Sequence, residues 1–336
     1  MPVKGARRSV ICDLHRGDFD FIPNDLYKIL MQIREAPVRE LRKELSDEDK
    51  GTFDEYFDFL VQKEYGFWCS KEEAELFQDI DFDFCFPSVI TNAILDLGKT
   101  LTYPLDRAFD ELDALGCKYL QIRFFQVMDI QSIQKLIKPL AFNRLHSIEL
   151  LIPWYEDLTE EDLRTMCRKN IKITSIIVSG YHENLSVLAG VNKITRLTFT
   201  RQRMSDCASC GNIHSAFFAV NIQAFSEALK YNSCLNGKIS IDVDGTIKNC
   251  PSMTKGFGKF GEVKLADALM ATSFKDSWGV NKDKIRECMD CEFRYVCTDC
   301  RAYLKDPADP LSKPLKCNYD PYTAAWKNQI NTEVTP

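Results

Sequence analysis

The cysteines of this chain gather in its C-terminal part, and their spacing restricts what that part can fold around. Nine of the 14 cysteines in the 336-residue sequence follow residue 200. Two C-x2-C pairs are separated by five residues and flanked by single cysteines. Thiolates that converge on one point repel one another unless a cation or an iron–sulfur core neutralises them, so we predict a metal framework. The nine residues are Cys207, Cys210, Cys234, Cys250, Cys288, Cys291, Cys297, Cys300 and Cys317.

Disulfides or buried core thiols are the alternative to metal ligation. The first eight residues lead into polar and acidic residues, so no secretory signal is predicted. No apolar run is long enough to cross a membrane. We therefore expect a cytoplasmic chain with reduced thiols, which favours metal ligands over disulfides. The five other cysteines stand singly, and we expect them in the core: Cys12, Cys69, Cys85, Cys117 and Cys167.

The charge of the chain argues against two classes of partner. Its formal net charge is −6. Residues 1–70 contain 11 Lys or Arg against 14 Asp or Glu. Binding to nucleic acid or to an anionic membrane requires clustered Lys and Arg, which neutralise phosphates. We therefore expect neither nucleic acid nor a membrane as a partner.

Residues 1–70 read as one small unit of strands followed by helices. Alternating apolar residues predict strands at 8–15 and 18–22, joined by a turn at Arg16-Gly17. Apolar residues at helical spacing predict three helices, with Asn24 as the first N-cap. The second helix begins at Pro37, the third covers 47–64, and a short strand is expected at 67–69. This order predicts a winged-helix outline.

Residues 86–200 alternate between strand and helix patterns, as expected for βαβ units in a parallel sheet. There are too few units for a closed eight-stranded barrel, so we expect a partial, open (β/α) barrel. The predicted strands are 89–97, 119–125, 147–152, 173–179 and 194–200, and the predicted helices are 105–115, 130–140 and 159–170.

The segment 237–250 predicts a β-hairpin, because Ile239, Ile241 and Val243 alternate with polar residues before Asp244-Gly245. A hairpin would bring Cys234 and Cys250 together at its open end. The C-x2-C pairs would each present two sulfurs from one tight turn. Zinc accepts such ligands as well as iron–sulfur clusters do, so zinc remains an alternative.

Residues 234–317 resemble a SPASM domain, the auxiliary-cluster module of radical SAM peptide-modifying enzymes. The family pattern is C-x(9–15)-G-x4-C, then C-x2-C-x5-C-x3-C and a final cysteine. This chain has C-x10-G-x4-C, then C-x2-C-x5-C-x2-C, one residue short, and then Cys317. The resemblance implies two [4Fe–4S] clusters and a SPASM domain over 201–336.

Carried over by position, the resemblance assigns ligands to each cluster. Cys288, Cys291, Cys297 and Cys317 would hold one cluster. Cys234, Cys250 and Cys300 would hold the other, with Cys210 or Cys207 as the fourth ligand. The shortened spacing before Cys300 puts the role of that residue in question. His214, four residues after Cys210, is a further candidate ligand.

One motif of the radical SAM family is missing. Those enzymes carry C-x3-C-x2-C after the first barrel strand, where it holds the cluster that cleaves S-adenosylmethionine (SAM). No two cysteines of this sequence have the C-x3-C spacing, and the loop 98–104 contains none. We therefore expect a degenerate radical SAM-like barrel over 86–200 that does not cleave SAM.

The whole layout resembles the SPASM-domain peptide maturases of grasp-with-spasm cassettes. The resemblance implies a role in maturing a ribosomally made peptide, with an ATP-grasp ligase and a precursor peptide as partners. Residues 1–70 resemble a PqqD-like peptide-recognition element, which would bind the precursor's leader as an added strand. No catalytic residue is predicted. The expected peptide-binding residues are Asp18, Phe19, Asp20, Phe21, Phe53, Phe57 and Leu60.

Two other functions fit the same residues. The clusters could carry out a redox step on the peptide itself, which would make the chain an enzyme. A zinc-stabilised structural or adaptor protein would explain the cysteines without redox chemistry. The colour and metal content of anaerobically purified protein separate these possibilities.

Overall fold

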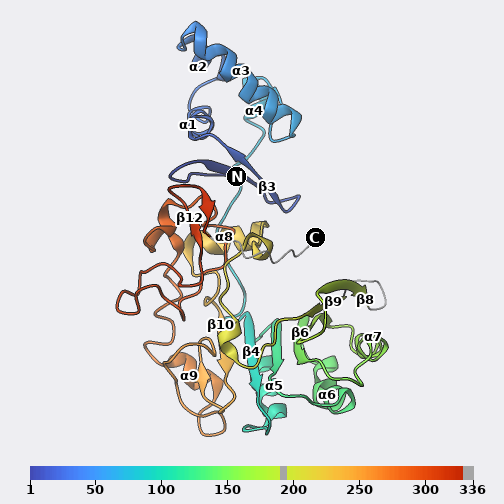
Figure 1. The fold of residues 1–336 in the computed structure, drawn as a ribbon. Coiled ribbons are helices and arrows are strands. Elements are labelled where there is room, and N and C mark those ends of the chain that lie inside the picture. Colours follow the sequence, from blue (N-terminus) through green and yellow to red (C-terminus); the bar gives the residue numbers. More distant parts are fainter. Residues whose placement is uncertain (190–194, 328–336) are drawn as a thin grey trace.

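The computed structural model describes residues 1–189 and 195–327 and shows a mixed α/β protein (Figure 1). A small N-terminal module stands at one end of the molecule, and a large sheet with its helices lies at the other. Segments from the C-terminal part lie between the two and along one side of the large sheet. This arrangement places the cysteine-rich segments in contact with both other parts of the chain.

Three antiparallel strands and three helices form the N-terminal module, with the strand order β1-β2-β3. One face of this sheet and the apolar stripes of α1 and α3 enclose a core of Ile11, Ile22, Leu26, Phe53, Phe57 and Leu60. The elements are β1 Pro2–Val3, β2 Ser9–Asp13, β3 Asp18–Ile22, α1 Asn24–Gln32, α2 Val38–Lys43 and α3 Asp47–Gln62.

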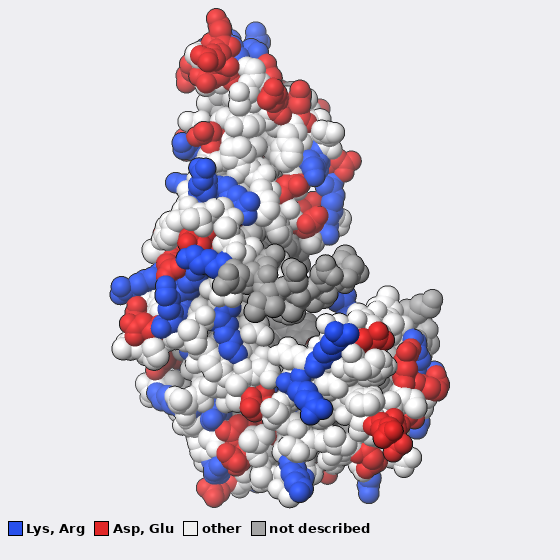
Figure 2. Space-filling model, viewed as in Figure 1, with Lys and Arg blue, Asp and Glu red and all other residues white. Residues whose placement is uncertain are grey.

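The surface of the module agrees with the acidic balance of its sequence. Asp47, Glu48 and Asp49 occupy the first turn of α3, where they complement the positive end of the helix dipole. Figure 2 shows acidic side chains gathered at this tip of the molecule. A surface of this kind repels phosphates.

Three details of the module differ from the sequence prediction. Asn24 is the first residue of α1 rather than its N-cap, and its side-chain oxygen accepts a hydrogen bond from Ser9 Oγ at 2.6 Å. Residues 67–69 form no strand, because Trp68 instead stacks on Phe57 with ring centres 5.4 Å apart. The strand β1 was not expected, and a short helix, α4 (Lys71–Ala74), follows the module.

The large sheet has eight strands in the order β11-β10-β4-β5-β6-β7-β9-β8. The six strands from β10 to β9 are parallel, and β8 and β11 are antiparallel to their neighbours. The strands are β4 Asn92–Leu97, β5 Tyr119–Phe124, β6 Ser147–Pro153, β7 Ile173–Ser179, β8 Leu185–Ala189, β9 Thr195–Thr200, β10 Lys238–Ile241 and β11 Ile247–Lys248.

Three helices cover one face of the large sheet (Figure 1). They are α5 Leu105–Ala114, α6 Ile130–Ile137 and α7 Glu160–Lys169. Leu112, Ile133 and Leu163, one from each helix, are almost completely buried against the strands. The motif Thr159-Glu-Glu-Asp162 predicts a capping box at the start of α7, and the side chains of Thr159 and Asp162 form it.

The sheet is larger than the five predicted strands. Edge strand β8 was missed, and β10 pairs in parallel with β4, so the sheet continues past residue 200. The first predicted strand begins three residues late, at Asn92. The last was expected from Ile194, which lies outside the described residues; β9 begins at Thr195.

The C-terminal part contains little regular structure apart from the hairpin. Its remaining elements are α8 Ile222–Lys230, α9 Leu265–Met270, β12 Tyr319–Asp320 and β13 Ala325–Trp326. Its apolar residues share a core with β1 and β2 of the N-terminal module, through contacts among Val10, Phe225, Phe293 and Tyr319. Within the described residues, no helix combines the length and the hydropathy that crossing a membrane requires.

Candidate functional site

The hairpin of β10 and β11 brings the first two predicted ligands together. Cys234 precedes β10 and Cys250 follows β11. The amide of Asn249 donates hydrogen bonds to the carbonyls of Leu235 at 3.0 Å and Lys238 at 2.7 Å, which ties the open end of the hairpin. Burial, followed by the charge of Cys234, raises the pKa of Cys250 to about 12.

Cys300 and Cys210 reach the same place from other segments. Gly211 has a φ of 87°, and a Cβ at this position would lie 2.9 Å from Cys300 Sγ. The backbone after Cys210 therefore passes directly against that sulfur, where only glycine fits. Burial raises the pKa of Cys300, and the charges of Cys234 and Cys210 add to the effect. These four thiols, the first thiol set, are near enough to interact electrostatically.

Cys207 lies beside this set, whereas the ring of His214 lies near those of Phe217 and Trp326. Cys207 Sγ is 3.9 Å from the Pro251 carbonyl oxygen. The charge of Cys210 is among the main influences on the pKa values of Cys250 and Cys300, and the charge of Cys207 is not. His214 Nδ1 accepts a hydrogen bond from the Ala216 backbone N–H at 3.1 Å. The choice of Cys210 rather than Cys207 as the fourth ligand therefore stays a prediction.

The other four predicted ligands form the second thiol set: Cys288, Cys291, Cys297 and Cys317. Burial raises the pKa of Cys297 to about 12 and that of Cys288 to about 11, and the charge of Cys317 contributes to both increases. Burial also raises the pKa of Cys291, with contributions from Glu292, Cys297 and Cys288. The short 3-10 helix Cys288–Asp290 carries the first of these thiols, and Cys291, Cys297 and Cys317 pack against one hydrophobic cluster.

The thiol sets are looser than a metal coordination sphere. Across residues 1–189 and 195–327, no group of three or more His, Cys, Asp or Glu side chains is arranged to hold a metal ion. The cysteines within each set interact electrostatically, which requires less proximity than coordination does. Binding a metal would therefore require the thiol side chains to converge further.

A half-buried lysine accompanies the first set, and a buried lysine accompanies the second. Burial opposes the charge of Lys238, yet the nearby thiolates raise its pKa, and its Nζ donates to Cys234 Sγ at 3.5 Å. Lys282 is 4% exposed, and its Nζ lies 3.7 Å from an Asp299 oxygen that is also 2.8 Å from Arg301. Two cations thus share one carboxylate beside the second set. Buried positive charge of this kind requires a negative partner.

The lone cysteines divide into two groups. Cys12, Cys117 and Cys167 are buried, as predicted. Cys69 and Cys85 are exposed, so their assignment to the core was wrong. Both lie in the segment that links the N-terminal module to the large sheet, where the apolar neighbours seen in the sequence do not close into a core.

The predicted peptide-binding strand is an edge strand, since β3 pairs with β2 alone in its sheet. Asp18, at its start, is exposed, and Asp20 accepts a hydrogen bond from the Tyr65 hydroxyl at 2.7 Å. The side chains of Phe19 and Phe21 lie on the face of β3 opposite to that of Asp18 and Asp20. Their ring centres lie 5.4 and 5.8 Å from that of Phe293, so these side chains contact the C-terminal part.

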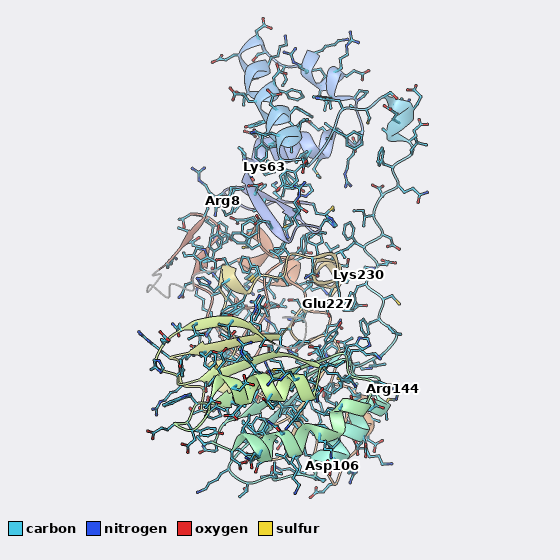
Figure 3. The ribbon with its side chains drawn as sticks, turned by 90° about the vertical axis from the view of Figure 1, so that its right-hand side faces the viewer. Arg8, Lys63, Asp106, Arg144, Glu227 and Lys230 are labelled. Atoms are coloured by element: carbon cyan, nitrogen blue, oxygen red, sulfur yellow. The ribbon has the colours of Figure 1, made fainter. Side chains whose placement is uncertain are left out.

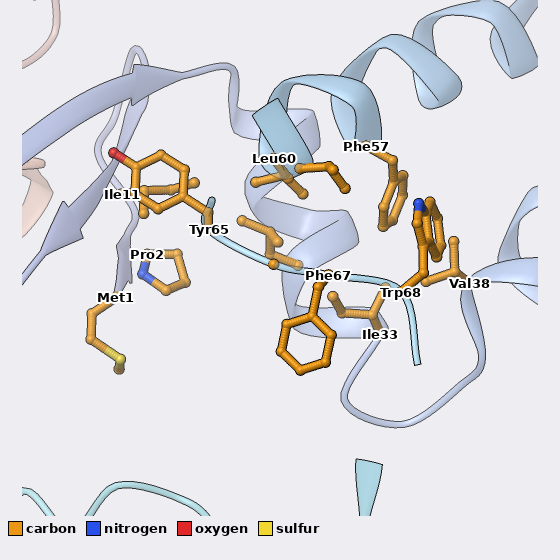
Figure 4. Close-up of a pocket in the computed structure, with 13 residues that line it drawn as sticks. Met1, Pro2, Ile11, Ile33, Val38, Phe57, Leu60, Tyr65, Phe67 and Trp68 are labelled. Atoms are coloured by element: carbon orange, nitrogen blue, oxygen red, sulfur yellow. The ribbon is translucent and has the colours of Figure 1, made fainter. Parts of the chain in front are cut away.

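A cavity of about 240 Å³ lies among the helices of the module (Figure 4). Of the α3 residues expected to bind peptide, Phe57 and Leu60 line this cavity, and Phe53 lies in the core. Val61 and Trp68 are 40% and 64% exposed at its surface. The complete lining is Met1, Pro2, Ile11, Leu30, Ile33, Val38, Phe57, Leu60, Val61, Tyr65, Gly66, Phe67 and Trp68.

The cavity and the predicted edge strand are on different sides of the module. The strand residues that line the cavity belong to β1 and β2, whereas the predicted peptide strand is β3, across the sheet from β1. The sequence signal for the cavity was the group of aromatic residues Tyr65, Phe67 and Trp68, of which the prediction assigned Phe67 and Trp68 to a short strand at 67–69. Aromatic side chains that remain exposed beside an apolar cavity favour contact with an apolar ligand.

The ends of the first barrel strands hold a buried ion pair. Arg123 donates to both carboxylate oxygens of Asp96, at 2.6 and 2.7 Å. The following loop, 98–104, contains no cysteine, and Thr102 Oγ1 donates to the Val243 carbonyl at 2.7 Å. This loop, which follows β4, therefore contacts the β10–β11 hairpin.

Comparisons with known protein families and with curated proteins find no match. Among solved structures, the crystal structure of Streptococcus suis SuiB matches with a TM-score of 0.34 and 11% sequence identity. The match covers 93% of this chain and 97% of SuiB. A TM-score this low does not establish a common fold, so the function must be inferred from the residues of the chain.

Proposed function

We propose that this chain is a maturation factor for a ribosomally made peptide. It binds the leader of a precursor through its N-terminal module and holds two [4Fe–4S] clusters in its C-terminal part. It acts beside an ATP-grasp ligase, which forms the new bonds in the precursor. The observations that carry the metal part of this proposal are the half-buried Lys238 beside one set of four cysteines and the buried Lys282 beside the other.

Buried lysine distinguishes metal-bound thiolates from free thiols. A thiol or a disulfide is neutral and cannot offset a buried ammonium group, which costs several kcal/mol, on the order of 3–5, when left unpaired. A four-thiolate cluster carries net negative charge and offsets it. Lys238 has a thiol as its hydrogen-bond partner, and Lys282 competes with Arg301 for Asp299. This support holds for iron–sulfur and for zinc alike, and the SPASM-like spacing favours iron–sulfur.

In the proposed arrangement, Cys210, Cys234, Cys250 and Cys300 would hold one cluster. Cys288, Cys291, Cys297 and Cys317 would hold the other. The clusters supply electron-transfer capacity and cross-links between distant segments. Gly211 keeps the approach to Cys300 open, and Asn249 holds the hairpin end that presents Cys234 and Cys250.

The N-terminal cavity supports the peptide part of the proposal. A peptide that docks there would place an apolar side chain against Phe57 and Trp68, while pairing its backbone with a strand edge. The acidic tip at α3 favours a leader with basic residues near its docking segment.

The proposal is tested first by metal content. Protein purified without oxygen should be brown and contain about eight iron atoms and eight sulfides per chain, four of each per cluster. Cys288→Ser should remove about half of the iron, because it breaks only the second set. The exposed Cys85→Ser is the matched control and should retain all of it. Colourless protein with stoichiometric zinc would contradict the iron–sulfur assignment and support an adaptor protein.

The partners are tested by co-expression with the products of neighbouring genes. The full-length protein should co-purify with the precursor and with the ligase. Deleting the leader from the precursor should abolish the complex. A precursor that is modified equally well without this chain would contradict a role in maturation.

A further inference from the structure

The N-terminal module rests on the loop that carries three residues of the second thiol set. The Ala6 backbone N–H donates to the Asp290 carbonyl at 2.8 Å, and the Arg294 guanidinium donates to the Lys4 carbonyl. Asp290 follows Cys288 by two residues. The contact therefore involves the turn between the first two cysteines of the set and the residues just after them.

An aromatic cluster centres on this loop. The ring of Phe293 lies 5.4 Å from Phe19 and 5.8 Å from Phe21 of strand β3. On its other sides it lies 5.0 Å from Phe218 and 5.1 Å from Tyr319. Contacts of this kind stabilise an interface well beyond the area they bury. One side chain, two residues after Cys291, thus holds the module to the C-terminal part.

A buried carboxylate defines how the two parts meet. Glu292 is completely buried, and Arg8 Nε donates to its Oε1 at 2.9 Å. The Tyr319 hydroxyl donates to the same oxygen, while Oε2 has no hydrogen-bond partner in the described part of the chain. Arg8 also lies over the Phe21 ring, 3.4 Å from its centre.

The close contact between the N-terminal module and the loop that contains Glu292 requires glycine at position 5. A Cβ on Gly5 would lie 2.4 Å from the Arg8 carbonyl oxygen and 3.0 Å from Glu292 Cβ. Figure 3 shows Arg8 where the N-terminal sheet meets the segments below it. Because a buried carboxylate is costly unless it is paired, the docked module stabilises Glu292 by supplying Arg8 as its cationic partner.

Resting on the proposed function, we propose that the loop from Cys288 to Cys297 couples the N-terminal module to the second metal centre. Metal held by Cys288, Cys291 and Cys297 fixes the loop in the shape on which the module docks. The docked module in turn favours the metal-bound shape of the loop, because coupling between two binding events is reciprocal. Arg8, Glu292 and Phe293 are positioning residues in this scheme.

The test uses full-length, metal-loaded protein and measures metal release to a chelator. Arg8→Met should accelerate release of the metal from the second centre about fivefold or more, the lower end of typical coupling between sites. The first centre should release its metal at the wild-type rate. Arg7→Met, an exposed neighbour, is the matched control and should change neither. Arg8→Lys, which keeps the positive charge but loses the planar guanidinium group, should give an intermediate rate of metal release.

A reciprocal measurement excludes a simple folding defect. Cys317→Ser weakens the second centre without touching the module, so protease cleavage in the exposed linker 71–81 should accelerate. Cys234→Ser, in the first set, should leave cleavage there unchanged. If the Arg8→Met protein contains the normal amount of metal and releases it at the wild-type rate, the proposed coupling is wrong. The proposed function would not be contradicted by that result. Wild-type protein that binds no metal would overturn both.

Discussion

At the scale of single residues, this chain is unusual for the positive charge that it buries near sulfur. Lys282 and Lys313 are 4% and 8% exposed, and both lie near thiols of the second set. Lys238 donates to a thiol of the first set. Cations this close to a redox centre stabilise its reduced, more negative state. The lysines would therefore adjust the electron affinity of a cluster as well as hold it.

This leads to a prediction for Lys238→Met in iron-loaded protein. Losing the ammonium group should shift the reduction potential of the first cluster to more negative values, by on the order of 50–100 mV. A redox titration followed by electron paramagnetic resonance measures the shift. Lys264→Met, an exposed lysine of the same region, should leave the potential unchanged. Equal potentials for both variants would show that Lys238 does not face the cluster.

At the scale of elements, the chain places helix α3 and the segment after it around an apolar cavity. Phe57 and Leu60 form its inner wall, while Val61 and Trp68 stay accessible at its surface. An apolar surface with accessible aromatic rings binds apolar side chains, and it loses affinity when an unpaired charge enters it.

Val61→Asp should therefore weaken leader binding about tenfold or more, which corresponds to roughly 1.4 kcal/mol. The change in Trp68 fluorescence during titration with a synthetic leader measures the affinity. Val127→Asp, at a valine 58% exposed in the barrel part, carries the same substitution away from the cavity and should bind as the wild type does. If both variants bind equally, the leader docks elsewhere, with the β3 edge as the next candidate.

Elements with local signals could be predicted from the sequence, and those that depend on distant contacts could not. The Thr159 capping box and the Asp244-Gly245 turn are set by neighbouring residues, and both were predicted correctly. The pairing of β10 with β4 joins segments 146 residues apart at Thr91 and Gly237, and no local pattern reveals it. Cys69 and Cys85 resembled core residues because their neighbours are apolar, although those neighbours are exposed or only partly buried.

In the candidate site, too, features with a local sequence signal could be predicted and features that depend on distant contacts could not. Cysteine spacing predicts which thiols gather, and both this grouping and metal binding stay predictions, although the charges of several of these thiols influence one another. The apolar cavity was only half anticipated. Phe57 and Leu60 follow from the helical stripe, whereas Trp68 depends on how the chain turns back after α3.

At the scale of the whole molecule, the described residues are organised around a large, mostly parallel sheet, for which we predict no cleavage of SAM. The loop after β4 contains no cysteine and contacts the hairpin through Thr102. With reductant and SAM, we expect no 5′-deoxyadenosine above the level of a blank reaction. Chromatography of the products measures it. Turnover that persists after contaminating enzymes are removed would contradict this expectation.

The pairing of β10 with β4 also has a consequence for how the chain is made. Strand β4 is the first of the large sheet to leave the ribosome, and its partner on one side is β10, whose residues follow well over one hundred positions later. Until then, β4 presents an unpaired edge, the kind of surface on which nascent chains aggregate. The hairpin that closes this edge also carries Cys234 and Cys250 at its base. A ribosome stalled before residue 238 would thus leave a chain with an open sheet and an incomplete first thiol set. If the first thiol set binds a cluster, its four ligands are all present only after the residues that cover this edge have been made.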